Sequence, residues 1–427
     1  MKVSSLSIFF AAAIASVPAV AYPSLYSTNN QRQRVTIRAS QNDTDDVSAE
    51  FLNGIKVANN GGTLVLKQND TYIIGKKLEL SGLNDIEVNL EGEIKFTDDI
   101  DYWQSNNFAY SFQNSITFWV WSGDNIKIYG EGTLNGNGQE WYNGFAGNEI
   151  LDSDNTYLRP ILFTVANSTN VTVEGIHFLN SPVWNTFLYQ VNNIAFDNVH
   201  VLAYSTNASA DPKNTDGFDS LRVDGLSITN SDINIGDDCI SPKPNTTNIF
   251  IQNVWCNGTH GVSMGSIGQY SGQYDIIENA YIQNVTLLNG QNGARLKSWA
   301  GADVGYGIIN NITYKDIYVS NTDNPILIDS CYFDINATEC AAYPSQVNVT
   351  NILFQNITGT SSGKNGDIVA YINCSPSGLC ANISFVDVDL TAPGYNDTEV
   401  ICNGVTGDIG VACIESNVTV EAKRMKW

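Results

Sequence analysis

Three short clusters in the middle of the chain hold side chains that could transfer protons to and from a substrate. The first contains Asn214 and Asp216, the second Asp237 and Asp238, and the third His260. Asp216 precedes Asp237 by 21 residues, and Asp238 precedes His260 by 22. Such even spacing predicts that the clusters occupy the same place in successive structural repeats, about 4.8 Å apart if parallel strands are stacked.

Carboxylates this close together favour acid–base chemistry on one bond. Like charges at short range raise the pKa of one carboxyl, so a protonated acid stands beside ionised bases. Glycoside hydrolysis needs this arrangement, because one acid protonates the leaving oxygen while another carboxylate activates water. Serine hydrolysis is disfavoured, since the chain has only two other histidines that could serve as the base. These two, His177 and His200, lie in strand-like repeats and are expected to be structural.

Asp237 and Asp238 are adjacent, so on a regular strand their side chains would point to opposite faces. Gly236 before them and Pro242 after them favour a bend. We therefore expect both carboxylates to reach one cleft, with Cys239 pointing inward. Taken alone, Asp237 and Asp238 could instead form a solvated turn or a calcium site. The charged residues expected beside them on adjacent repeats disfavour both alternatives.

Two cations, Arg295 and Lys297, follow one longer repeat later and share a strand face because they are two residues apart. We expect them to extend the column of acids. A guanidinium offers a fork to a carboxylate and an ammonium offers a point charge. Salt bridges to the aspartates are the structural alternative, whereas an acidic sugar bound beside the scissile bond is the functional interpretation.

The elements that must position these residues form a repeat of short strands. An Asn or Asp is followed by alternating apolar residues, a polar corner and a second apolar pair. The repeat begins at Asp85, Asn125, Asn170, Asn193, Asn248, Asn279, Asn311, Asn351 and Asn382. Period-two alternation with Asn and Gly corners predicts an all-β, right-handed parallel β-helix, a single-domain solenoid. A β-propeller is disfavoured because the spacings are too short and uneven for its four-stranded blades.

Three segments are expected along the chain. Residues 1–21 resemble a secretory signal peptide, with an apolar run that ends in Ala19-Val20-Ala21. Residues 22–45 are expected to form a leader and N-terminal cap, and residues 46–427 the β-helix catalytic domain. Apolar residues at Val47, Phe51, Leu52, Ile55 and Val57 predict a short amphipathic helix that caps the open end.

Composition and cysteine usage indicate a secreted protein. The 427 residues include 44 acidic and 21 basic side chains, a net charge of −23, which argues against binding to nucleic acid or an anionic membrane. We expect a secreted, extracellular, glycosylated monomer with no cofactor and no metal, since no CxxC motif is present for zinc. The eight cysteines suggest disulfides between neighbours, namely Cys239–Cys256, Cys331–Cys340, Cys374–Cys380 and Cys402–Cys413.

The charged clusters resemble the motifs of glycoside hydrolase family 28, the pectin-degrading polygalacturonases. They appear in family order as Asn214-Thr215-Asp216, Gly236-Asp237-Asp238, Thr259-His260-Gly261 and Arg295-Leu296-Lys297. Thr259 stands where the family commonly has Gly. The resemblance covers most of the chain after about residue 40, and it implies a right-handed parallel β-helix and an acidic plant cell-wall polysaccharide (pectin, homogalacturonan) as partner.

The resemblance also implies inverting hydrolysis of α-1,4-galacturonosyl linkages. Asp237 would be the general acid, Asp216 and Asp238 would position and deprotonate water, and His260 would keep the acid protonated. Inverting enzymes commonly separate acid and base carboxyls by about 6.5–9.5 Å. The residues expected to bind substrate are Arg295, Lys297, Asn214 and Tyr332, the last as a substitute for a Tyr that endo-acting members carry in this region.

Two segments look most like fungal exopolygalacturonases, whose loops close one end of the cleft so that single galacturonic acid units leave the non-reducing end. They are the insert at residues 99–119 and the run SMGSIGQY at residues 263–270, and the YPS and GTSSG segments at residues 343–345 and 359–363 show the same resemblance. An exo-acting rhamnogalacturonan galacturonohydrolase and an endo-polygalacturonase are the alternatives of the same class. A non-catalytic polysaccharide-binding solenoid and a calcium-dependent lyase are alternatives of other classes.

Overall fold

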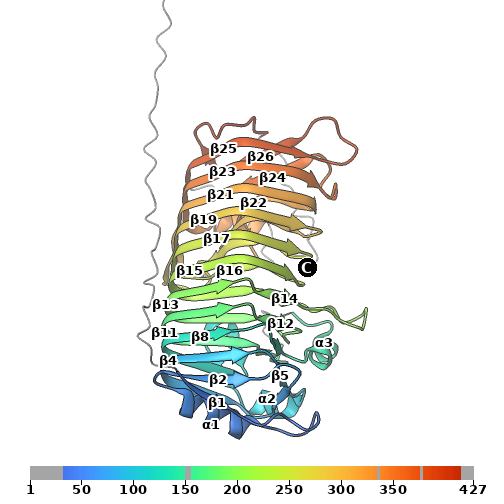
Figure 1. The fold of residues 1–427 in the computed structure, drawn as a ribbon. Helices are drawn as coiled ribbons and strands as arrows, with labels where there is room; N and C mark the ends of the chain where they lie inside the picture. Colours follow the sequence, from blue (N-terminus) through green and yellow to red (C-terminus); the bar gives the residue numbers. More distant parts are fainter. Residues whose placement is uncertain (1–31, 150–154, 334–336, 376–377, 415–427) are drawn as a thin grey trace, which may run out of the picture. The chain divides into compact units, whose positions relative to one another are not determined.

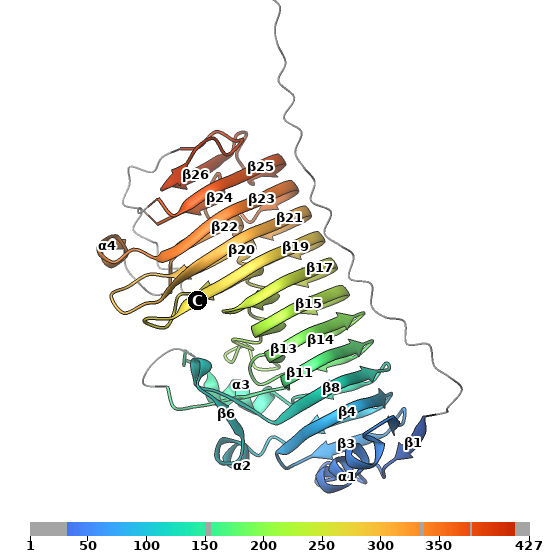
Figure 2. The same cartoon turned by 90° about the vertical axis from the view of Figure 1, so that its left-hand side faces the viewer.

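The computed structural model describes residues 32–149, 155–333, 337–375 and 378–414. Parallel strands from successive coils stack in register along this length (Figures 1 and 2), and the predicted right-handed parallel β-helix is confirmed. Within these ranges no helix has the length and apolarity that crossing a bilayer requires. The predicted signal peptide, residues 1–21, lies outside the described residues, as does the first part of the predicted leader.

The coils are built from long strands that bend at corners and from shorter strands beside them. In chain order the strands are β1 (Gln33–Thr36), β2 (Gly62–Leu66), β3 (Thr71–Ile74), β4 (Leu78–Leu90), β5 (Glu93–Phe96), β6 (Phe108–Tyr110), β7 (Ser115–Thr117), β8 (Trp119–Tyr129), β9 (Thr133–Asn135), β10 (Pro160–Ile161), β11 (Phe163–Glu174), β12 (His177–Leu179), β13 (Thr186–Asp197), β14 (His200–Leu202), β15 (Phe218–Asn234), β16 (Ile240–Pro242), β17 (Thr246–Asn257), β18 (Val262–Ile267), β19 (Tyr274–Leu288), β20 (Asn292–Trp299), β21 (Tyr306–Thr322), β22 (Asn324–Tyr332), β23 (Gln346–Ser361), β24 (Ile368–Asn373), β25 (Cys380–Thr391), β26 (Glu399–Asn403) and β27 (Val405–Thr406). The helices are α1 (Ser48–Ala58), α2 (Ile100–Ser105), the 3₁₀ turn η1 (Phe112–Asn114), α3 (Gln139–Phe145) and α4 (Ala337–Ala342).

The repeat found in the sequence coincides with one corner of the coil. All nine residues that begin the repeat have positive φ, between 47° and 60°, and Gly225 occupies the corner of the coil between Asn193 and Asn248. Asn and Gly tolerate this left-handed backbone better than other residues. Asn side chains also hydrogen-bond from coil to coil; for example, Asn311 Nδ2 donates to Asn279 Oδ1 at 2.8 Å. The corners therefore fix where each coil turns.

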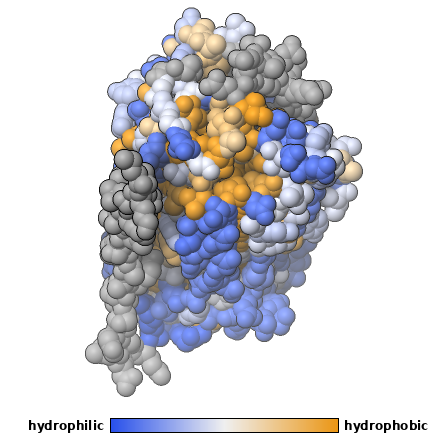
Figure 3. Space-filling view, turned by 90° about the horizontal axis from the view of Figure 1, so that it is seen from above, coloured by the Kyte–Doolittle hydropathy of each residue, from blue (hydrophilic) through white to orange (hydrophobic). Residues whose placement is uncertain are grey.

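The residue after each corner points inward and stacks on its equivalents. One continuous column in the paired strands consists of Ile86, Ile126, Val171, Ile194, Leu226, Ile249, Ala280, Ile312, Ile352 and Ile383. Each is at most 3% exposed. Seen from the end where the last coils lie, apolar surface gathers at the centre and hydrophilic surface surrounds much of it (Figure 3), as expected for a solenoid core.

The predicted capping helix is α1, which packs against the first strands. Val47, Phe51 and Ile55 are buried as expected, because residues four apart share one helix face. Val57 falls on the opposite face and is 46% exposed, so its predicted place in the apolar stripe is wrong. Before the helix, β1 pairs in parallel with β2 and so extends the stack by one strand.

All four predicted disulfides are formed. They join Cys239 to Cys256, Cys331 to Cys340, Cys374 to Cys380 and Cys402 to Cys413. Cys239 is completely buried, directly after Asp238. This bond therefore anchors the segment that carries two of the predicted catalytic residues.

The insert at residues 99–119 leaves the coil and forms a small sheet of its own. It contains α2, β6, η1 and β7; β6 pairs with β7 in antiparallel fashion, and β10 adds in parallel to the other edge of β7. Phe112 in η1 packs with Trp184, Phe187 and Leu221 of later coils in a second apolar cluster. The insert is therefore fixed on the coils that lead to the charged clusters.

Candidate active site

The acids and the histidine lie at equivalent positions of successive coils. Phe218 pairs with Ile240, and Ile240 pairs with Val262. The residues two positions before these three are Asp216, Asp238 and His260, so they share one place in the coil. The even spacing predicted this column correctly.

Both adjacent aspartates reach the cleft, as the flanking Gly236 and Pro242 predicted. The backbone bends at Asp237, and the cleft is lined by Asp216, Asp237, Asp238 and His260 together. The side chain of Asp237 is 16% exposed, against 6% for Asp216 and 2% for Asp238. Asp237 is thus the carboxylate that a bound polysaccharide can reach most easily.

The three carboxylates form a tight cluster. One oxygen from each lies within 4.8 Å of one from each of the others. The reason is the register, because Asp216 and Asp238 face each other across neighbouring coils and Asp237 is adjacent in sequence. Oxygens this close can hydrogen-bond to the same water molecule.

Asp238 is the most completely neutralised of the three. Ser263 Oγ donates to it at 2.6 Å and Ser241 Oγ at 3.1 Å, and Lys297 Nζ makes a close ion pair with Oδ2. Burial and Asp237 would raise its pKa, but Lys297, helped by more distant cations, holds the pKa of Asp238 below its usual range. Asp238 is therefore ionised under ordinary conditions.

Asp237 and Asp216 have pKa values shifted in opposite directions in the empty cleft. Burial alone would raise the pKa of Asp237, but His260 Nδ1, 3.0 Å away, together with Lys297 holds it well below its usual range. Burial, with Asp219 and Asp237 as negative neighbours, raises the pKa of Asp216 well above its usual value. One proton can therefore stay within the cluster while the other two carboxylates are ionised.

Asn214 is held against the acid by a residue that the sequence analysis missed. Its Nδ2 donates to Asp237 Oδ2 at 3.3 Å, and its Oδ1 accepts from Arg159 Nη2 at 2.8 Å. Arg159 also donates to the carbonyl oxygens of Pro182 and Lys213. It lies 55 residues before Asn214, at the end of a loop without a motif, so no sequence signal pointed to it.

The cations lie beside the acid column rather than in it. Arg295 pairs in register with Ser263, three residues beyond His260, and Lys297 pairs with Gly265. The expectation that they continue the column is therefore wrong, because the longer coil before β20 shifts the register. Both side chains still line the cleft, and both lie about 5 Å from the ring of Tyr332, at 5.2 and 5.0 Å. Tyr332 is thus placed at the predicted site.

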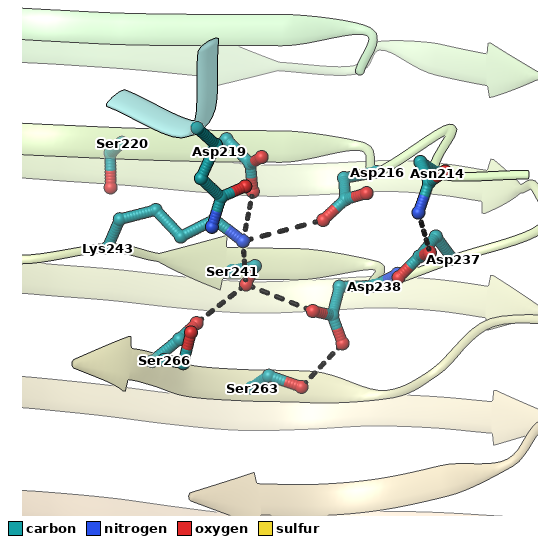
Figure 4. A network of polar contacts seen from close by, with 12 residues as sticks. Asn214, Asp216, Asp219, Ser220, Asp237, Asp238, Ser241, Lys243, Ser263 and Ser266 are labelled. Atoms are coloured by element: carbon teal, nitrogen blue, oxygen red, sulfur yellow. Dashed lines mark hydrogen bonds and ion pairs between the residues drawn. The ribbon is translucent and has the colours of Figure 1, made fainter. Parts of the chain in front are cut away.

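A buried network beneath the cleft was not predicted. Lys243 Nζ lies 3.5 Å from Asp216 Oδ2 and 3.1 Å from Asp219 Oδ1, and it donates to Ser241 Oγ at 2.7 Å (Figure 4). Lys243 follows an ordinary apolar strand, where the sequence pattern resembles that of a surface lysine. Only the register with β15 shows that it is buried.

The other two histidines lie on strands away from the cleft lining. His177 and His200 stack on each other with ring centroids 4.5 Å apart, and His200 contacts Asp232 on the next coil. They do not line the cleft.

The insert forms part of one wall of the cleft. Gln113 lines it, its backbone N–H donates to the Tyr270 hydroxyl at 2.9 Å, and its Nε2 donates to Gln269 Oε1 at 3.3 Å. These contacts join segments 157 residues apart in the sequence. Trp184 forms part of the same wall.

A parallel β-helix whose cleft gathers carboxylates, a histidine and buried cations defines a polysaccharide-cleaving glycoside hydrolase. The chain belongs to the glycosyl hydrolases family 28, whose family model matches residues 63–414. It is 65% identical over 384 residues to a protein named probable exopolygalacturonase B from Aspergillus oryzae, covering 90% of this chain and 88% of the relative. It is 64% identical over 383 residues to exopolygalacturonase B from Aspergillus niger, covering 90% and 87%.

Solved structures of polysaccharide hydrolases are among those similar to this one. The endo-xylogalacturonan hydrolase of Aspergillus tubingensis is 29% identical with a TM-score of 0.80, over 89% of this chain and 98% of that one. A hyperthermoactive exopolygalacturonase from Thermotoga maritima is 18% identical with a TM-score of 0.61, over 84% and 88%, and shares the fold.

Proposed function

We propose that this chain is an exopolygalacturonase that hydrolyses α-1,4-linked galacturonic acid from the non-reducing end of homogalacturonan. The observation that carries exo action is that Gln113 of the insert lines the cleft and is held there by the Tyr270 hydroxyl. The insert is proposed to block one end of the cleft, so that a chain end can enter but the interior of a long polymer cannot pass through. The names of the Aspergillus relatives support the same activity.

The proposed chemistry assigns one step to each part of the cluster. Asp237, the most exposed carboxyl, gives its proton to the glycosidic oxygen as the bond to the anomeric carbon breaks. Asp216 and Asp238 hold a water on the opposite side and take its proton as it attacks, which inverts the anomeric centre. After product release, the proton taken from water leaves Asp216 or Asp238 for solvent, and His260 passes a new proton from solvent to Asp237 for the next cycle.

The proposed setting is extracellular. The predicted signal peptide, the predicted glycosylation and four disulfides support secretion, because disulfides persist in oxidising compartments. We propose that the enzyme acts there as a monomer on pectin. The carboxylates of the cleft are matched by Lys243, Lys297 and Arg295, so hydrolysis is proposed to proceed without metal or cofactor.

Wild-type enzyme on polygalacturonic acid is expected to release monomer from the first time point, as β-galacturonic acid. Chromatography of early products and proton NMR of the anomeric signal measure both features. Parallel reactions contain rhamnogalacturonan and xylogalacturonan, to test the alternative substrates. Early oligomers with a rapid fall in viscosity would contradict exo action, and a product absorbing in the ultraviolet would indicate a lyase.

Tyr270→Ala is expected to turn part of the exo activity into endo activity, because it removes the hydroxyl that accepts from Gln113 and the ring that packs on Phe112. The oligomer fraction of early products should rise several-fold. Tyr274→Ala is the matched control, since Tyr274 is 48% exposed and four residues away. Monomer as the sole early product of both variants would show that the wall does not set the mode of attack.

A further inference from the structure

The ammonium of Lys243 is buried among three oxygen-bearing side chains. Its residue is 4% exposed, and its Nζ contacts Asp216, Asp219 and Ser241 at 3.5, 3.1 and 2.7 Å. Ser241 Oγ in turn lies 3.1 Å from Asp238 Oδ2 (Figure 4). Asp216 and Asp238 are the two carboxylates that hold water in the proposed mechanism. Lys243 thus contacts Asp216 directly and Asp238 through Ser241.

Asp219 depends on this cation. It is completely buried, and within the described part of the chain neither of its oxygens accepts an aligned hydrogen bond, so Lys243 is its ion-pair partner. An ion pair buried in this way is fixed, because separating the charges leaves one of them uncompensated in a medium of low dielectric constant. The pair can therefore act as a rigid support under the cleft.

We propose that Lys243 is a positioning residue that divides its charge between Asp219 and Asp216 and so fixes Asp216, and Asp238 through Ser241, for holding the attacking water. This inference rests on the proposed role of Asp216 and Asp238. Asp219 competes with Asp216 for the positive charge of Lys243. Lys243 and Asp219 are 4% and 0% exposed, whereas the side chains of Asp237 and His260 are 16% and 15% exposed.

The charges around Asp216 give the direction of the effect. Its negative neighbours are Asp219 on β15 and the pair Asp237 and Asp238 before β16. Lys243, directly after β16, is the nearest cation. The other cations around the cleft are Arg159, Arg295, Lys297 and, when protonated, His260. Burial, Asp219 and Asp237 raise the pKa of Asp216, and Lys243 opposes them. Removing Lys243 therefore raises this pKa further, whereas removing the charge of Asp219 lowers it.

The test measures kcat/KM against pH for Lys243→Met, Asp219→Asn and the double variant, on the polysaccharide that the wild type cleaves best. Asp216 must be ionised to take a proton, so its pKa sets the acidic limb of the profile. Lys243→Met should move that limb to higher pH and lower kcat 10- to 100-fold. Asp219→Asn should move it to lower pH, and the double variant should lie between the two.

Lys127→Met is the matched control, because Lys127 forms a 3.0 Å pair with Glu174 in which both side chains are about half exposed. Its profile should equal that of the wild type. An acidic limb that stays in place in Asp219→Asn and in Lys243→Met would overturn the proposal, and Asp219→Asn alone decides it if Lys243→Met does not fold. Because every variant is assayed on the substrate of the wild type, a wrong substrate assignment would leave these shifts measurable.

Discussion

Asp237→Asn is expected to lower kcat on polygalacturonic acid about a thousandfold, equivalent to about 4 kcal/mol of transition-state stabilisation. The asparagine has the shape of the aspartate but cannot release a proton to the glycosidic oxygen. The fold should persist, since the amide oxygen can still accept from the Asp238 backbone N–H, a bond of 2.7 Å in the wild type. Initial rates and the thermal unfolding midpoint are measured together.

A substrate with a good leaving group separates acid catalysis from other losses. A nitrophenyl galacturonide needs little protonation as its bond breaks, so Asp237→Asn should retain most of its activity on that substrate. Equal losses on both substrates would contradict the assignment of the acid. In that case Asp216, whose pKa is raised by burial and by its negative neighbours, becomes the candidate donor.

The opposite pKa shifts of Asp216 and Asp237 bear on how the cycle begins. The raised pKa of Asp216 favours a proton on that carboxyl, whereas the proposed acid is Asp237. Substrate binding brings another negative charge to Lys297 and Arg295 and displaces water from Asp237. Both changes favour a protonated Asp237, because they reduce the cationic field on it and its solvation. His260, 3.0 Å from Asp237, is the group through which that proton can arrive.

The parts of the fold that repeat could be predicted from the sequence. Asn279 and Asn311 mark corners because few residues tolerate left-handed backbone, and the apolar residue after each marks the core. The column of Asp216, Asp238 and His260 followed from equal spacing. Arg295 and Lys297 were placed wrongly because the coil before them is longer, and spacing alone does not show where the extra residues lie.

Contacts that occur once in the structure could not be predicted. Lys243 is buried only because β16 lies between β15 and β18, and its place in the sequence resembles that of many exposed lysines. The bond between Gln113 and Tyr270 joins two irregular segments, and their conformations depend on packing against Phe112 and Trp184 rather than on a repeated pattern. Sequence thus predicted the column that holds the reacting groups better than the wall that shapes the cleft.

Arg295→Gln is expected to remove most of the preference for a free galacturonate carboxylate. Arg295 lines the cleft, and its guanidinium lies 3.9 Å from Asp238, whereas Lys297 pairs with that carboxylate closely. Losing one partner of a buried charge pair costs about 2–4 kcal/mol, so kcat/KM on galacturonan oligomers should fall about 30- to 1000-fold. On the corresponding methyl esters, which wild type should cleave poorly, the variant should change little.

Lys297→Met makes the comparison decisive, because Lys297 pairs directly with Asp238 and also lines the cleft. Its loss should disturb the water-holding carboxylate and lower activity on the acid and the ester alike. The ratio of kcat/KM for acid over ester should therefore collapse in Arg295→Gln and survive in Lys297→Met. If Arg295→Gln leaves the acid-over-ester ratio of kcat/KM unchanged, Arg295 does not bind the substrate carboxylate. Its role would then be to stabilise the ionised forms of the buried carboxylates Asp238 and Asp329.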